Sequence, residues 1–151
     1  MLIRTHLAFA ILAILIFISH VNNQVIFAIM VLVATFLPDA DSAYSTLGQK
    51  KFFSFLQIFV RHRGLLHSFT FAILTTLLFV LFIPILAFGF FLGYGLHLFI
   101  DSFTLEGIRP FYPSRTTTKW RLKTGGLFEN GLFVGIVLAD LFILSFVLNV
   151  F

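Results

Sequence analysis

Two side chains that could do chemistry, His97 and Asp101, lie within an otherwise apolar segment, GYGLHLFIDSFT, at residues 93–104. They are four residues apart, so in a helix both project from the same face. Inside an apolar bundle, an imidazole and a carboxylate normally pair with each other or bind a cation. A single pair of this kind is more often a structural hydrogen-bonded pair than a metal site. Whether His97 and Asp101 form a metal site therefore depends on which other polar residues the fold brings beside them.

Histidine and acidic residues also stand at the ends of other apolar segments, in the motifs PDAD and HRGLLHS among others. The chain thus has eight candidate metal ligands: His6, Asp39, Asp41, His62, His67, His97, Asp101 and Glu129. Mixed nitrogen and oxygen ligation suits Zn²⁺, Mn²⁺ or Fe²⁺. Each motif alone has a plainer interpretation (PDAD could simply be a turn that ends a helix), but together they predict a metal or proton-handling site. The number of ligands suggests two metals, or one metal with supporting carboxylates.

The composition places the chain in a membrane. Of its 151 residues, 60% are hydrophobic and 23 are phenylalanine, and the mean hydropathy is +1.07. A soluble domain of this length could not bury so much apolar surface. The length suits one domain, residues 1–151, and the absence of cysteine excludes disulfides and thiolate metal sites.

Five apolar stretches predict an all-α, polytopic membrane bundle of about five transmembrane helices. They cover residues 7–21, 24–37, 65–83, 85–103 and 127–151, with Pro84 dividing the third from the fourth. The last three stretches are long enough to span. The first two are short, because about 15 residues give roughly 22 Å of helix against a hydrocarbon core of roughly 30 Å. They could extend beyond these limits, thin the bilayer or form a re-entrant hairpin.

The basic residues predict the orientation. In a five-span arrangement all of them fall on one side: Arg4, Lys50, Lys51, Arg61, Arg63, Arg109, Arg115, Lys119, Arg121 and Lys123. The positive-inside rule makes that side cytoplasmic, with the N-terminus inside and the C-terminus outside. We therefore expect a multi-pass protein of the inner or plasma membrane whose candidate ligands gather at the cytoplasmic leaflet.

Two segments between the spans are expected to lie at the membrane surface. Residues 50–61 place Lys50, Ser54, Gln57 and Arg61 on one face, which predicts a cytoplasmic interfacial helix. Residues 109–126 carry five basic residues and Trp120. We expect this segment to cover the site and to contact anionic lipid head groups rather than nucleic acid, because topology already explains its charge.

The motifs, taken in order, resemble those of a known family. His6, LPDADS, HRGLLHS, GYGLHLFIDSFT with Gly107, and Glu129 look like the YdjM-type family of membrane-bound metal-dependent hydrolases, over nearly the whole chain. That family is in turn similar to zinc-dependent phospholipases C and related single-strand nucleases, which cleave phosphate esters with clustered zinc ions.

The resemblance implies a ligand set. One ion would be held by an aspartate of PDAD with His67, His97 and Asp101, and Asp101 would bridge to a second ion near His6. His62 and Glu129 would be further ligands, giving one to three ions, with zinc expected. Family members often have a histidine where this chain has Ser42, so this site would hold one ion fewer if that histidine is a ligand.

The expected chemistry is hydrolysis of a phosphate ester, on a lipid or another amphiphile, by metal-activated water. Asp39 or Asp41 could accept the proton from that water. Arg63, between the two histidines of HRGLLH, could grip a phosphate, although a basic residue that only fixes topology is an equally good interpretation.

Two other functions use the same residues. The chain could be a metal or proton transporter. It could also be a membrane protein whose fold a bound metal stabilises and which catalyses no reaction, called a metal-stapled protein below. A site at one leaflet favours neither kind of transport, because transporters place their sites near the midplane. Asp140, in the middle of the last apolar stretch, could mark a proton path or pair with a hydroxyl such as that of Thr75 or Thr76.

Overall fold

The structure is a computed structural model that describes residues 1–41 and 65–150, without the side chains of residues 40, 41 and 147–150. Its helices are α1 (Ile3–Phe17), α2 (Gln24–Phe36), α4 (Phe69–Phe82), α5 (Pro84–Asp101) and α6 (Leu127–Val150). Short 3-10 turns follow α1 (η1, Ile18–His20) and α2 (η2, Pro38–Asp41). Within these ranges there is no strand, only two isolated β-bridges, so the predicted all-α class is confirmed.

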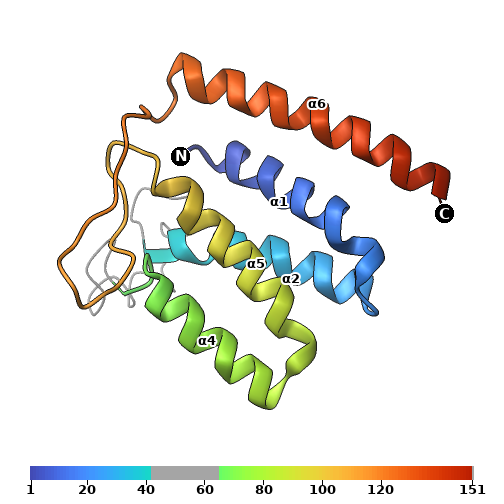
Figure 1. The fold of residues 1–151 in the computed structure, drawn as a ribbon, viewed down its shortest axis with the longest axis horizontal. Coiled ribbons are helices and arrows are strands. Elements are labelled where there is room, and N and C mark those ends of the chain that lie inside the picture. Colours follow the sequence, from blue (N-terminus) through green and yellow to red (C-terminus); the bar gives the residue numbers. More distant parts are fainter. Residues whose placement is uncertain (42–64, 151) are drawn as a thin grey trace.

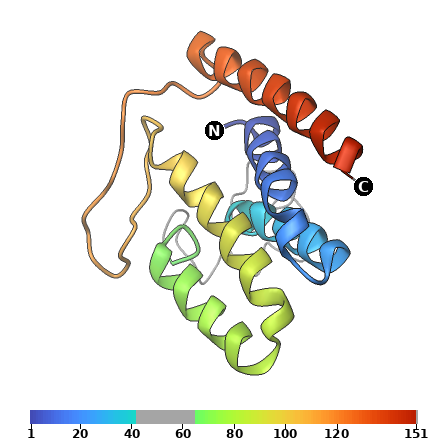
Figure 2. The same cartoon turned by 45° about the vertical axis from the view of Figure 1, so that its right-hand side comes forward.

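α5 is the central helix of the bundle (Figures 1 and 2). It packs against α1, α2 and α4, whereas α6 packs against α1 and no other described helix. The starts of α1, α4 and α6 and the ends of α2 and α5 meet at one end of the molecule, on the left in Figure 1. The polar residues at these helix ends are thereby brought to one level.

The helix lengths correct the expectation from hydropathy. The described residues contain three helical segments long and apolar enough to cross a membrane: Ile3–His20, Pro84–Asp101 and Leu127–Phe146. The first segment is longer than its apolar stretch, because the helix already begins at Ile3 and includes the polar residues Arg4 to His6. The third stretch gives only the 14 residues of α4, roughly 21 Å of helix, which is shorter than predicted.

Local side-chain chemistry explains where α4 and α5 begin. Ser68 caps α4, since its hydroxyl accepts a hydrogen bond from the backbone N–H of Phe71, and residues 65–68 remain outside the helix. Pro84 is the first residue of α5, where its missing N–H costs nothing. The break predicted at Pro84 is therefore confirmed. The interfacial helix predicted at residues 50–61 lies outside the described residues.

The outer surfaces of the bundle are apolar. Leu81 and Phe82 on α4 and Leu138 and Phe142 on α6 are all exposed, with exposed fractions between 62% and 76%. Water would penalise such surfaces, whereas lipid solvates them. The apolar exterior and the long apolar helices agree with a membrane location.

α2 and α5 approach each other closely at Gly93. A Cβ atom built on Gly93 would collide with the backbone of Val31, including its carbonyl oxygen. Small residues permit such close approach between membrane helices. On the same helix, a Cβ atom on Gly95 would meet nothing within 4 Å.

We expect Gly93→Ala to destabilise the bundle by about 1–3 kcal/mol, because the added methyl meets backbone that no rotamer change can move. Gly95→Ala is the matched control and should leave the stability unchanged or slightly higher, since alanine is the better helix former. Thermal unfolding in detergent, followed by circular dichroism, measures both. Equal losses in the two variants would contradict the predicted close contact.

Candidate metal centre

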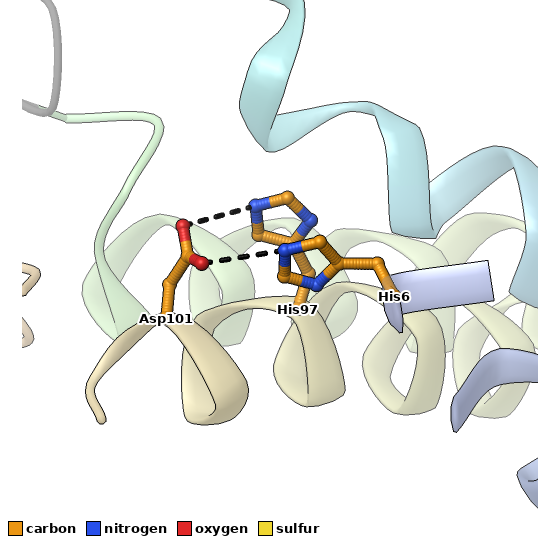
Figure 3. A group of neighbouring side chains, drawn as sticks. All are labelled: His6, His97 and Asp101. Carbon is orange, nitrogen blue, oxygen red and sulfur yellow. Dashed lines mark ion pairs between the residues drawn. The ribbon is translucent and has the colours of Figure 1, made fainter. Parts of the chain in front are cut away.

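The centre of the site is the carboxylate of Asp101, at the end of α5. Its Oδ2 lies 3.6 Å from Nε2 of His97, one turn earlier on the same helix, and its Oδ1 lies 3.3 Å from Nε2 of His6 on α1. Figure 3 shows each oxygen facing a different imidazole. The two rings are stacked, with their centroids 4.0 Å apart and their planes 11° from parallel. The predicted sharing of one helix face by His97 and Asp101 is confirmed.

Asp39 and His67 bring the site to four ligand atoms around one gap. Oδ1 of Asp39, in η2, lies 3.7 Å from Nε2 of both His67 and His97. Nε2 of His67, just before α4, lies 3.9 Å from Oδ2 of Asp101. In a tetrahedral site with bonds near 2.1 Å, neighbouring ligand atoms are roughly 3.4 Å apart. The four N–O separations, 3.6–3.9 Å, are a few tenths of an ångström longer than that spacing.

Several imidazole nitrogens at this site make no hydrogen bond to the described part of the chain. Nε2 of His97 and both ring nitrogens of His6 are buried and make no hydrogen bond there. A buried polar atom without a hydrogen bond costs about 1–3 kcal/mol, so native structures rarely leave several together. A cation would satisfy Nε2 of His97 and Nε2 of His6, the nitrogens that face the carboxylate of Asp101. Ligand atoms of His6, His97 and Asp101, and of Asp39, His67 and His97, form two groups that could hold a metal ion.

The backbone of α2 sets the orientation of His97. Its Nδ1 lies 2.8 Å from the carbonyl oxygen of Thr35. A carbonyl only accepts hydrogen bonds, so Nδ1 must carry the proton and donate it. The lone pair is then on Nε2, which faces Asp39 and Asp101. Ligand histidines in metal sites are commonly held by a hydrogen bond of this kind.

His67 is positioned by contacts on both sides of it in the chain. The hydroxyl of Tyr94, one turn before His97 on α5, donates a hydrogen bond to the carbonyl of Leu66. The backbone N–H of Phe69 donates to the carbonyl of Pro110, 2.8 Å away. α5 and the segment that follows it therefore both hold the turn that carries His67.

Asp39 is the member of the site that reaches water. Its side chain is 26% exposed, while the other four are at most 3% exposed. Burial raises the pKa of Asp39, but the nearby imidazoles of His67 and His97 outweigh this and leave its pKa below the ordinary value. Asp39 is thus a carboxylate at neutral pH and the most exposed member of the site.

Glu129 lies near the site but has other partners. Its Oε1 accepts hydrogen bonds from the backbone N–H of Leu2 and from the hydroxyl of Thr5, and its Oε2 accepts one from the N–H of Gly125. These contacts fasten the start of α6 to the start of α1, next to His6. The structure does not bring Glu129 into either ligand group, and its predicted role as a ligand remains a prediction that this arrangement does not favour.

Other predicted residues lie apart or outside the description. The side chain of Asp41 and the whole of His62 and Arg63 are among the residues that the structure does not describe. Asp140 on α6 is 8% exposed, and its Oδ1 makes no hydrogen bond to the described residues. Pairing of Asp140 with Thr75 or Thr76 is wrong, because those residues are on α4, which does not contact α6.

Three features of the site were not predicted from the sequence. They are the carbonyl of Thr35, the hydroxyl of Tyr94 and the amino group of Met1, which lies 2.5 Å from Oδ1 of Asp101. Tyr94 could have been noticed, since it stands three residues before His97 in the same motif. The other two are backbone groups, for which a sequence pattern gives no signal.

The described fold and site define a class of protein: an all-helical membrane protein with a buried histidine and aspartate cluster that could bind a metal ion. The chain belongs to the family of YdjM inner membrane proteins, whose sequence pattern it matches over residues 1–149. The YdjM family and the membrane location predicted from the motifs are thereby confirmed, whereas the metal-dependent hydrolase activity stays a prediction. No curated protein and no solved structure matches the chain. The similarity to phospholipases C is not supported by these comparisons.

Proposed function

We propose that this protein is a membrane-bound, metal-dependent hydrolase that cleaves a phosphate ester. One observation carries the proposal: ligand atoms of Asp39, His67, His97 and Asp101, from three segments of the chain, lie close together, with N–O separations of 3.6–3.9 Å. One of these ligands, Asp39, has a partly exposed side chain. A purely structural ion needs no such exposure, whereas a hydrolytic one needs room for water and substrate.

A bound divalent ion, with Zn²⁺ as the first choice for two imidazoles and two carboxylates, would lower the pKa of its water to about 7 and screen a phosphate oxygen. The remaining tasks belong to the chain. His97 is held in position by Thr35, and His67 by the turn that Tyr94 fastens. Asp41, two residues beyond Asp39, is our candidate for accepting a proton from water, and Arg63 for contacting the phosphate.

We place the site at the cytoplasmic side of the inner membrane, where the substrate would be a lipid or another amphiphile entering from the leaflet. The basic residues of the segment between α5 and α6 support this side through the positive-inside rule. The chain has no cysteine, so a single cysteine at position 123 can be labelled selectively in oriented membranes. Labelling of position 123 from the periplasmic side would contradict the orientation.

A metal or proton transporter is the second candidate, because Asp140 is a buried carboxylate within a membrane-length helix. Against it, the candidate ligands gather at one end of the bundle, whereas transporters bind their ions near the midplane. A metal-stapled protein without turnover would use the same ligands.

The decisive experiment is an activity screen with the metal-loaded wild type in detergent or nanodiscs. The panel consists of phosphomonoesters and phosphodiesters, both lipid and soluble. We expect the protein to hydrolyse at least one of them, and a chelator should abolish that hydrolysis. Metal-loaded protein that hydrolyses none of them would contradict the enzyme, and metal-ion or proton flux into proteoliposomes would then separate the transporter from the stapled protein.

A further inference from the structure

The segment between α5 and α6, residues 102–126, lies at the boundary between lipid and water. It joins the ends of two helices that are long and apolar enough to cross a membrane, on the same side as the metal centre. It carries five basic residues and a single acidic one, Glu106. Phe111 and Trp120 in this segment are 63% and 66% exposed. Exposed aromatic and basic side chains at this level are typical of contact with lipid head groups.

Backbone hydrogen bonds hold this segment in a defined shape. The N–H of Leu105 donates to the carbonyl of Leu122, the N–H of Leu122 to that of Phe103, and the N–H of Trp120 to that of Thr104, with lengths of 3.0–3.2 Å. Thr104 in turn donates through its hydroxyl to the carbonyl of Asp101. The strand-like stretch around Trp120 is therefore fastened directly to the end of α5, rather than free to move as a loose loop.

A surface pocket opens on this fastened stretch. Its volume is about 620 Å³, and it is lined by Leu105, Lys119, Trp120 and Arg121. Two cationic side chains thus flank an indole and a leucine in one depression. An anionic phosphate suits the cations, and the apolar surfaces suit the glycerol and the first carbons of an acyl chain.

We propose that this pocket is a binding site for the phosphate head group of an anionic phospholipid from the surrounding leaflet. Its position between two membrane-length helices selects a lipid as occupant, because the head groups of the same leaflet stand at this level. Lys119 and Arg121 contact the phosphate, and Trp120 lies in the interface beside the glycerol. The proposal goes beyond hydrolysis and does not depend on it, because none of the four lining residues is a candidate metal ligand.

The chain itself supplies the probe, since Trp120 is its single tryptophan. Brominated phosphatidylglycerol, diluted into phosphatidylcholine nanodiscs that hold the full-length protein, should quench Trp120 fluorescence. Brominated phosphatidylcholine at the same fraction in phosphatidylglycerol should quench it much less. This preference for phosphatidylglycerol should persist with a chelator present, so the result of the quenching experiment does not depend on the metal centre. Equal quenching by the two lipids in the wild type would overturn the proposal.

The double variant Lys119→Gln/Arg121→Gln removes the two cations of the pocket. Each basic residue near an anionic surface contributes roughly fivefold in affinity, so the preference should fall by on the order of 30-fold. Arg115→Gln/Lys123→Gln is the matched control: it removes the same charge from exposed residues of the same segment that do not line the pocket. This control should retain most of the preference.

Two further outcomes would also overturn the proposal. Equal losses in the two double variants would mean that the attraction is spread over the segment and that the pocket is not a site. Loss of the preference on adding excess inorganic phosphate would mean that the pocket takes a soluble phosphate rather than a lipid. An unchanged Trp120 emission spectrum of each variant in uncharged detergent verifies that the segment keeps its fold.

Discussion

His97→Ala protein, purified without chelator, is expected to contain no stoichiometric divalent metal, whereas the wild type carries at least one first-row ion. His97 belongs to both groups of side chains that could hold an ion. Its Nε2 lies 3.7 Å from Oδ1 of Asp39 and 3.6 Å from Oδ2 of Asp101, so its loss removes a ligand atom from each group. Loss of a direct ligand should weaken metal binding by on the order of 100-fold or more. Asp101→Ala should have the same effect.

Elemental analysis of the purified proteins, followed by chelator competition, measures this loss. His20→Ala is the matched control, because His20 ends the 3-10 turn after α1, at the other end of the bundle, and is exposed. It should retain the wild-type metal content. Wild-type protein without metal, both as purified and after reconstitution with Zn²⁺, Mn²⁺ and Fe²⁺, would refute the metal centre itself.

The His6→Ala variant reports how many metal ions bind. Oδ2 of Asp101 faces the four-atom gap, while Oδ1 faces His6 and the Met1 amino group. His6 is thus not needed for an ion in that gap. If two ions bind, His6→Ala should lose one of them. If one ion binds in the gap, His6→Ala should keep it.

The sequence was sufficient for the class of fold and for much of the core of the site. Hydropathy gave the apolar helices, and Pro84 gave the break between α4 and α5, because proline removes a backbone donor whatever its surroundings. The spacing of His97 and Asp101 required only that residues 93–101 be helical. These features follow from local chemistry, which a sequence displays directly.

Helix limits were less predictable, because caps and tertiary contacts set them. Hydropathy predicted that the first helix starts at residue 7. In the structure it begins at Ile3, because Glu129 accepts hydrogen bonds from Leu2 and Thr5. Hydropathy also extended the third helix back to residue 65, where the Ser68 cap shortens it. Apolar character describes what a residue contacts, and not whether its backbone is helical.

The division of roles among the carboxylates depended on the fold as well. Asp101 and Glu129 were both candidate ligands in the sequence, Asp101 at the end of one apolar segment and Glu129 at the start of another. In the structure Asp101 faces imidazoles, while Glu129 accepts hydrogen bonds from two backbone N–H groups and a hydroxyl. The donors come from residues as much as 127 positions away in the chain. No spacing pattern encodes such a distant partner.

The two aspartates of PDAD should separate metal binding from catalysis. Oδ1 of Asp39 lies 3.7 Å from Nε2 of both His67 and His97, which is the position of a direct ligand. We therefore expect Asp39→Asn to lose metal and, with it, all metal-dependent hydrolysis, because an amide oxygen is a weaker ligand than a carboxylate. Asp41→Asn should keep the metal, since the four-atom gap is complete without it. If Asp41 accepts the proton from water, this variant should lose about 10²- to 10⁴-fold in kcat.

Measuring metal content and turnover on the same preparations distinguishes the three candidate functions. A hydrolase predicts that the metal-replete Asp41→Asn protein is slow, with kcat reduced and KM little changed, because a base acts on the water and not on substrate binding. A transporter predicts no turnover in the wild type and defective transport in both variants. A metal-stapled protein predicts that Asp39→Asn only loses stability. If Asp39→Asn keeps its full metal content, the ligand set is wrong, and Asp39 instead becomes the candidate base at the open side of the site.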